Sequence, residues 1–192
     1  MGLRDVLFGR KQLKDAAGER LFAISTARVT LEAELDLKPA GSAGVCFKSL
    51  SAGEFVRAEN ELQELLDAVA AESGSKVTRT SDEFGFEWLV VTDGDFEDLV
   101  TTVHLVASEL QSRGFGPQLL AAVFPFEKTG FDGGRVFWIY GFKRGKFWPF
   151  VPKGDDKERD NAEEFELKSK LERELPIEED LTRWFAVFDA PV

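Results

Sequence analysis

The chain has 192 residues, a net charge of −11, one cysteine and one histidine. A chain of this length can bury a core without disulfide bonds, and with Cys46 and His104 as its only such residues it lacks the ligands of the usual zinc site. The acidic balance disfavours nucleic acid as a partner, because phosphate binding needs clustered cations. No run of about 18 apolar residues occurs, so we expect no membrane-spanning helix.

The first fourteen residues combine an apolar helical face with an excess of cations. A helix this short is marginal alone in water and needs a surface to lie against. That surface could be the chain's own core, a second copy, a partner protein or lipid. We expect the amphipathic basic segment 1–14 to be a docking segment. Its candidate contact residues are Leu3, Arg4, Val6, Leu7, Phe8, Arg10, Lys11 and Lys14.

Two strands are predicted next. Residues 27–36 alternate between apolar and polar side chains, which is typical of a half-exposed strand. The sequence "KPAGSAG" is typical of a turn, and "VCFK" then predicts a second strand with Cys46 in its middle. We interpret Cys46 as a buried thiol rather than a nucleophile, because the single histidine is expected on another element.

A helix and a hairpin follow. Apolar residues recur with helical spacing from Ser51 or Gly53 to about Glu72, and Gly74 is expected to end that helix. Residues 76–81 and 86–92 are predicted to pair as a hairpin whose turn spans Asp82 to Gly85.

A second helix is predicted to begin at Asp95 and to end at Gly114. Asp95 is expected to cap its N-terminus, and this capping explains "DGDFED" better than a calcium loop does. His104 lies beside the apolar stripe and is interpreted as a rim or core residue rather than a catalytic one. The expected buried stripe consists of Phe96, Leu99, Val100, Val103, Val106, Ala107 and Leu110.

Residues 117–128 predict a strand that Pro125 confines to an edge or a strand end. The glycines at 130, 133 and 134 are not followed by a helix, so they do not match a phosphate-binding loop.

The next segment, "RVFWIYGFKRGKFWPFVP", predicts a hairpin that is rich in aromatic side chains. Phe137 and Ile139 are expected on one face, with Phe142 as a candidate third, and Val136, Trp138 and Tyr140 on the other. Both faces are bulky, so we expect helices on one and another sheet, an arm or a partner on the other. The cations lie only at the turn, which disfavours a nucleic-acid platform.

The remaining residues, 155–192, are expected to form an acidic helix and an anchoring tail. Residues 155–180 carry twelve acids and five bases. The helix is predicted over 155–175 with a narrow stripe of Phe165, Leu167, Leu171 and Leu175. After Pro176, a helical spacing of Leu181, Trp184, Phe185 and Phe188 predicts an anchor on the body of the protein.

Six sequence blocks together resemble the PspA-associated protein family of the PspAB type. They are "MGLRDVLFGR", "VCFK", "DEFGFEWLVV", "VFPF", "YGFKRGKFWPF" and "LPIEEDLTRWFAVFD", which run from the first residues to the last and contain no catalytic signature. The resemblance implies a bacterial or archaeal cytoplasmic protein that acts alongside PspA, a coiled-coil protein that coats stressed inner membranes. It implies no enzymatic activity and no residue roles.

These observations predict one α+β domain over residues 1–192, with an antiparallel sheet built from hairpins, helices on one face and a candidate internal duplication. The first functional hypothesis is a non-enzymatic accessory protein that binds PspA or the membrane periphery, with self-association as an option and no cofactor. The alternative is a small-ligand binder or enzyme with an aromatic pocket at this aromatic hairpin, the third hairpin of the chain, between the hairpin and the helices. The candidates to line that pocket are Trp88, Trp138, Tyr140 and Trp148.

Overall fold

The computed structural model describes residues 18–48, 64–69, 71–128, 134–154 and 157–192. The segment 1–14, the first part of the helix predicted after Ser51 and the glycines at 130 and 133 lie outside the described residues. Residues 64–69 and 71–73 are helical, as predicted, and Gly74 follows them with a φ of 71°.

One antiparallel sheet of seven strands organises the described part of the chain, in the order β3-β4-β2-β5-β6-β7 with β1 also paired to β5. The strands are β1 (Leu37–Pro39), β2 (Ser42–Lys48), β3 (Lys76–Ser81), β4 (Phe86–Thr92), β5 (Leu119–Lys128), β6 (Arg135–Gly141) and β7 (Lys146–Phe150). A second sheet pairs only β8 (Pro152–Lys153) with β9 (Glu158–Arg159). The predicted α+β class and the hairpins β3–β4 and β6–β7 are confirmed.

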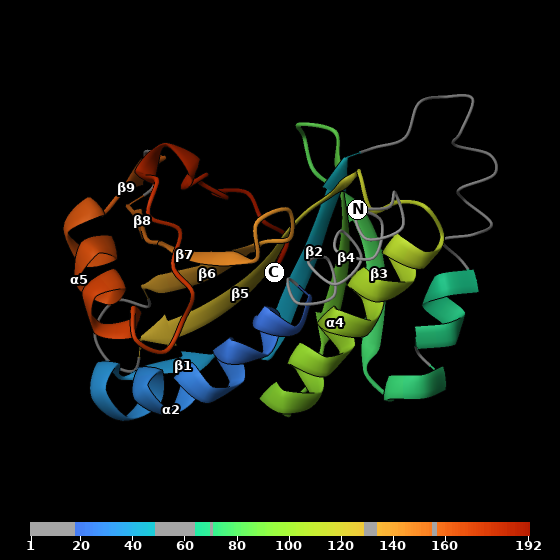
Figure 1. The fold of residues 1–192 in the computed structure, drawn as a ribbon, viewed down its shortest axis with the longest axis horizontal. Coiled ribbons are helices and arrows are strands. Elements are labelled where there is room, and N and C mark those ends of the chain that lie inside the picture. The colour runs from blue at the N-terminus through green and yellow to red at the C-terminus, as the bar shows by residue number, and fades with distance from the viewer. Residues whose placement is uncertain (1–17, 49–63, 70, 129–133, 155–156) are drawn as a thin grey trace, which may run out of the picture.

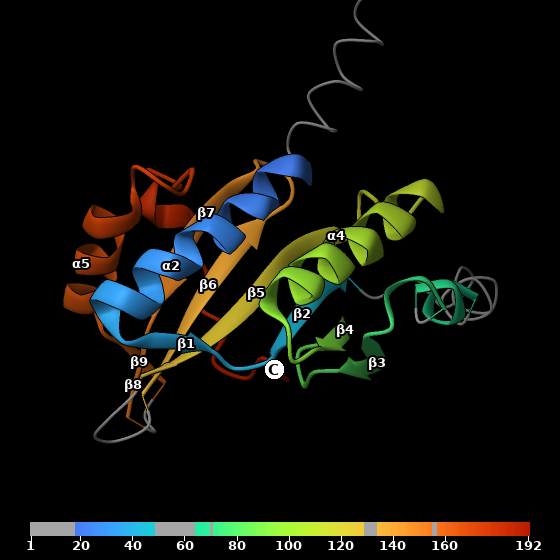
Figure 2. The same ribbon diagram turned by 90° about the horizontal axis from the view of Figure 1, so that it is seen from below.

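The helices α2 (Ala23–Leu35) and α4 (Phe96–Ser112) cover one face of the sheet (Figures 1 and 2). A short 3-10 helix, η1 (Arg20–Phe22), leads into α2. The cap at Asp95 is confirmed, because its side chain accepts hydrogen bonds from the backbone N–H groups of Glu97 and Asp98. The predicted stripe of α4 is buried throughout, and Phe96 packs edge-on against Phe124 of β5.

The strand predicted over residues 27–36 is wrong, because these residues form most of α2. The buried side chains Ile24, Ala27 and Leu31 follow helical spacing, whereas Val29 is 64% exposed. Ala, Glu, Leu and Arg favour the helix, and the polar–apolar alternation within it was misleading. The helix ends where Asp36 adopts a left-handed φ of 52°. The predicted "KPAGSAG" turn is shorter than expected, since Pro39 and Ser42 already belong to strands.

Pro125 does not mark a sheet edge, because β5 lies inside the sheet between β2 and β6. The Pro125 carbonyl accepts from the Ala40 N–H, on the side where β1 passes into β2. The N–H and C=O groups of one strand residue point to the same side. The side of Pro125 that lacks an N–H therefore faces the break between β1 and β2. The pairing of Pro125 with Phe137 of β6, on its other side, stays intact.

The acidic helix α5 spans Asn161–Leu171, so the prediction of a helix from 155 was too long at both ends. Residues 158–159 belong to β9 instead. Leu167, Leu171 and Leu175 are buried as predicted, but Phe165 is 48% exposed. The buried position beside it is Glu164, which accepts from the Val151 N–H and from Arg159 Nε, both at 3.0 Å.

The C-terminal tail, defined as residues 184–192, is not a helix. Within residues 177–192, all of which the structure describes, the only helical element is the 3-10 turn η2 (Leu181–Arg183). The tail then crosses the sheet face opposite α2 and α4 (Figure 1). Trp184 is buried and Phe188 packs edge-on against Phe150, so these two rings anchor the tail as predicted. Leu181 and Phe185 are exposed. The single domain over 1–192 and the internal duplication stay predictions.

Candidate functional site

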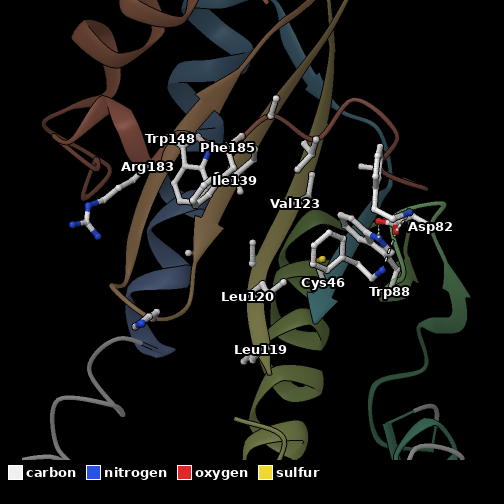
Figure 3. A pocket seen from close by; sticks show the side chains of 18 of the residues that line it. Cys46, Asp82, Trp88, Leu119, Leu120, Val123, Ile139, Trp148, Arg183 and Phe185 are labelled. Carbon is white, nitrogen blue, oxygen red and sulfur yellow. Dashed lines mark hydrogen bonds between the residues drawn. The ribbon is translucent and has the colours of Figure 1, made fainter. Parts of the chain in front are cut away.

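A pocket of about 740 Å³ lies on the sheet face that carries the C-terminal tail. We call it the tail pocket. Its floor comes from β2, β4, β5, β6 and β7, and its walls come from the tail and from the β3–β4 and β6–β7 turns (Figure 3). Its apolar lining includes Phe84, Phe86, Trp88, Leu119, Leu120, Ala121, Val123, Ile139, Trp148, Val187 and Phe188. The volume falls in the range of small-ligand pockets.

The strand register explains the hollow. Cys46 pairs with Trp88 of β4 and with Ala121 of β5, and Ala121 pairs with Gly141 of β6. Directly opposed residues project on the same face of a sheet. One row of this face therefore consists of the large indole of Trp88 followed by three small residues, Cys46, Ala121 and Gly141. A Cβ added at Gly141 would lie 3.0 Å from a ring carbon of Trp148, so the indole packs directly over this glycine. The hollow therefore lies between two indoles, over small residues.

Two of the four aromatic residues predicted for a ligand site line this pocket. Trp88 donates its indole N–H to Asp82 at 2.9 Å, and Trp148 donates to the Phe185 carbonyl at 3.1 Å (Figure 3). Each indole is thus held in one orientation by a defined acceptor.

The predicted location of the pocket, between the aromatic hairpin and the helices, is wrong, because the tail pocket lies on the face away from the helices. The other two residues, Trp138 and Tyr140, lie on the helix-covered face. Trp138 pairs with Phe124, which contacts α4 through Phe96, so this face is covered by the helices. Both residues are fully buried, and Phe142 packs edge-on against Tyr140 rather than beside Ile139. The aromatic hairpin therefore divides its rings between the core and the tail pocket.

Polar contacts and a close backbone approach fix the tail across the sheet. The Trp184 carbonyl accepts from Arg159 Nη1 at 2.8 Å, and the Val192 carbonyl accepts from Arg135 Nη1 at 2.8 Å. A Cβ added at Gly44 would lie 2.7 Å from a Val192 methyl carbon, so glycine allows the tail to approach β2. Among the described residues no strand pairs with the tail along this path, and Phe185 stays 67% exposed.

The pocket is positively charged in a negatively charged chain. Six cations and three carboxylates line it, a net charge of +3 against −11 for the whole chain. The cations are Lys48, Lys143, Arg144, Lys146, Lys157 and Arg183, and the carboxylates are Asp82, Glu178 and Asp189. Low-dielectric walls strengthen the field of such a cluster and attract anions.

The three carboxylates are engaged in structural bonds. Asp82 accepts from the backbone N–H groups of Phe84 and Phe86 in the turn, besides Trp88. Glu178 lies 2.7 Å from Arg144 Nε, and Asp189 lies 2.9 Å from Lys157 Nζ. Each carboxylate thus shapes the pocket wall.

Cys46 lines the same pocket with its sulfur (Figure 3). Burial raises the pKa of its thiol to about 12, and the Asp82 carboxylate acts in the same direction. A thiol with this pKa is almost entirely protonated at neutral pH and a poor nucleophile. The interpretation of Cys46 as a buried, inert thiol is therefore supported.

His104 is remote from this pocket. It lies on α4 with its ring centroid 4.9 Å from that of Phe22, and burial lowers its pKa. Over the part of the chain that the structure describes, no group of three or more His, Cys, Asp or Glu residues could hold a metal ion. The same described residues contain no helix long and apolar enough to cross a membrane.

The two indoles and the turn cations could be identified in the sequence, but their convergence on one pocket could not. Cys46, Ala121 and Gly141 are ordinary strand residues whose importance depends on register. The tail was expected to be helical, so its role as a wall was not foreseen. The eight candidate contact residues of the segment 1–14 lie outside the described residues.

Comparison with known proteins places the chain in a family. The family model described as PspA associated protein B matches residues 1–192. The chain belongs to the PspA associated protein B family. No curated protein and no solved structure matches it. Membership in the PspA associated protein B family supports a role associated with PspA. In the described part of this family member, the tail pocket combines an apolar floor with six cationic side chains.

Proposed function

We propose that this protein is a non-enzymatic accessory protein that acts by binding, alongside PspA, in the membrane-stress response. Family membership supports the association with PspA. The observation that favours binding over catalysis is the state of the reactive groups in the tail pocket. The Cys46 thiol is protonated at neutral pH, and Asp82, Glu178 and Asp189 are each engaged in structural bonds.

The segment 1–14 is proposed to dock this protein on PspA or at the membrane surface, through the contact residues named from its sequence. Burial of its four apolar side chains would yield on the order of 6–10 kcal/mol before costs. Ordering the segment costs about as much, so docking is reversible and depends on the four cations. The protein is accordingly proposed to be cytoplasmic, with peripheral contact at the inner membrane.

The association is tested by size-exclusion chromatography with light scattering, on the full chain alone and mixed with PspA. A complex that elutes earlier than either component is expected, and the mass of the chain alone reports self-association. Failure to form a complex at micromolar concentrations contradicts the proposed function.

A matched pair of variants tests the docking segment within the same experiment. In one variant Leu3, Val6, Leu7 and Phe8 are replaced by Ser, and in the other Arg4, Arg10, Lys11 and Lys14 are replaced by Gln. Both should weaken the complex, the second more strongly at low salt because exposed charges are screened. An unchanged complex with both variants removes the segment from the proposal.

A second candidate function is small-ligand binding in the tail pocket. It is favoured by one observation: Trp88 and Trp148 line a pocket of about 740 Å³ in which both indoles are held by hydrogen bonds. Large, oriented aromatic rings provide much apolar contact area at a low cost in conformational entropy. This function is compatible with PspA association, because the two proposals invoke different residues.

A further inference from the structure

We propose that the tail pocket binds a single-chain amphiphile with an anionic head group, such as a fatty acid or a lysophospholipid with an anionic head. This inference rests on the second candidate function above and names its ligand class. It is carried by the way in which apolar side chains and cations are distributed along the pocket.

The apolar half of the site is the floor between the two indoles. Val123 of β5 pairs with Ile139 of β6, and Ile139 pairs with Trp148 of β7, so these three side chains share the pocket face. Val187 and Phe188 of the tail add a wall to this region. Figure 3 shows Val123 and Ile139 between Trp148 and Trp88. The floor offers little to a sugar or a nucleotide, which would need polar partners, and suits a hydrocarbon chain.

The cationic half lies at one end of the sheet. Lys48 is the last residue of β2, and its N–H bonds to the Gln118 carbonyl just before β5 begins. Gly141, the last residue of β6, pairs with Lys146, the first residue of β7, and Lys143 lies in the turn between them. Because β2 and β6 both run to this end and flank β5, the three lysines gather beside the start of β5.

These three lysines are available to a ligand. Among the described residues no ion pair involves Lys48, Lys143 or Lys146, whereas Arg144, Lys157 and Arg183 are paired with carboxylates at 2.7 to 2.9 Å. The excess positive charge of the pocket is therefore concentrated at one end of an apolar floor. A carboxylate or phosphate head at the lysines would place a hydrocarbon chain over Ala121 and Val123, toward the tail.

Two exposed rings mark the mouth of the pocket. Phe84 on the β3–β4 turn is 63% exposed and Phe185 on the tail is 67% exposed, and both line the pocket. Aromatic rings offer a large apolar contact area to a ligand that enters beside them. Occupancy by an apolar chain would remove part of these rings from water.

Isothermal titration calorimetry on the full chain tests the proposal, with octanoate, decanoate and dodecanoate below their micelle concentrations. Each added methylene should tighten binding about fourfold until the pocket is full. Dodecanoyl lysophosphatidylglycerol tests a phosphate head from a lipid source. Dodecyl maltoside and dodecyltrimethylammonium supply the same chain with a neutral and a cationic head.

Two charge variants form the matched control. The triple variant Lys48→Gln, Lys143→Gln, Lys146→Gln should weaken dodecanoate binding about tenfold. The triple variant Lys38→Gln, Lys76→Gln, Lys153→Gln changes the net charge equally at exposed positions away from the pocket and should bind as the wild type does. A third variant, Ala121→Phe, should block the chain-binding floor, with circular dichroism to confirm that it folds.

Chain-length dependence together with loss in the pocket triple variant supports the proposal, for either anionic ligand. Equal binding of the anionic, neutral and cationic dodecyl ligands overturns the anion preference and leaves only an apolar pocket. Absence of amphiphile binding overturns the proposal as a whole, and if Ala121→Phe then weakens the PspA complex, the pocket belongs to the protein partner. Complex formation with PspA and amphiphile binding are measured in separate experiments, so failure of either proposal is distinguishable from failure of the other.

Discussion

The two faces of the sheet are covered in different ways, although the same aromatic hairpin contributes rings to both faces. On one face α2 and α4 seal Trp138 and Tyr140 completely from water. On the other, an extended tail crosses the strands and leaves a hollow between Trp88 and Trp148. A helix buries a continuous stripe, whereas an extended segment without strand partners covers only its own path. One face is therefore sealed core, and the other keeps a pocket lined by two indoles.

A matched pair of substitutions on β6 and β7 should have the largest and most different effects on stability. Trp138→Ala, on the sealed face, should lower the free energy of unfolding by roughly 3–5 kcal/mol, because it leaves a cavity among packed side chains. Trp148→Ala, beside the hollow, should lower it by only roughly 1.5–3 kcal/mol. Urea denaturation measures both, and an equal or reversed order contradicts the distinction between the faces.

The reactivity of Cys46 probes the pocket face directly. With a thiol pKa of about 12 instead of 9.0, the thiolate fraction at mildly alkaline pH falls on the order of a thousandfold. Alkylation by iodoacetamide, followed by mass spectrometry, should be slow in the native protein and fast in urea. Rapid native alkylation would mean that Cys46 is neither buried nor protonated as described.

Glu164 shows that the tail side depends on polar contacts. It is 2% exposed and pairs with Arg159, which also donates to Trp184 at the start of the tail. Glu164→Gln should cost about 1–3 kcal/mol, less than for a fully buried pair because the Arg159 side chain is 25% exposed. Glu166→Gln on the same helix is the control and should change the free energy of unfolding by less than about 0.5 kcal/mol.

The smallest expected effect concerns His104 on the helix-covered side. Burial lowers its pKa, so the folded state favours the neutral ring. Its contribution is therefore present above the unfolded value of 6.5 and is lost as pH falls through the lower folded value. Denaturation at about pH 7.5 and about pH 5 should show a smaller loss of stability for His104→Gln than for the wild type. Equal losses would mean that His104 does not contribute.

The sequence predicted the elements with strong local signals. The cap at Asp95, the stripe of α4 and the β3–β4 hairpin follow from capping, periodicity and turn residues. It failed where two patterns overlap, as in residues 27–36, which alternate like a strand yet form a helix because Ile24, Ala27 and Leu31 meet the sheet. The prediction also failed for Pro125. This proline is tolerated inside the sheet because the break between β1 and β2 lies beside it.

The candidate site was predictable only in part. Trp88 and Trp148 were named from the sequence as candidates to line a pocket at the aromatic hairpin, but the separation of Trp138 and Tyr140 from them depends on register across three strands. The lysines Lys48, Lys143 and Lys146 are about a hundred residues apart in the sequence at their extremes, and only the sheet brings them to one end. Such convergence is a property of tertiary pairing and leaves no local signal.

The most direct test of the account is the response of the four indole N–H signals in a ¹⁵N-correlated NMR spectrum during titration with dodecanoate. Trp88 and Trp148 should shift with ligand, while Trp138, fully buried on the helix-covered face, should not. Assignment follows from single Trp→Phe variants. A shift of Trp138 in place of Trp88 and Trp148, or no shift of any indole at millimolar ligand, would contradict the division of the sheet into a sealed face and a binding face.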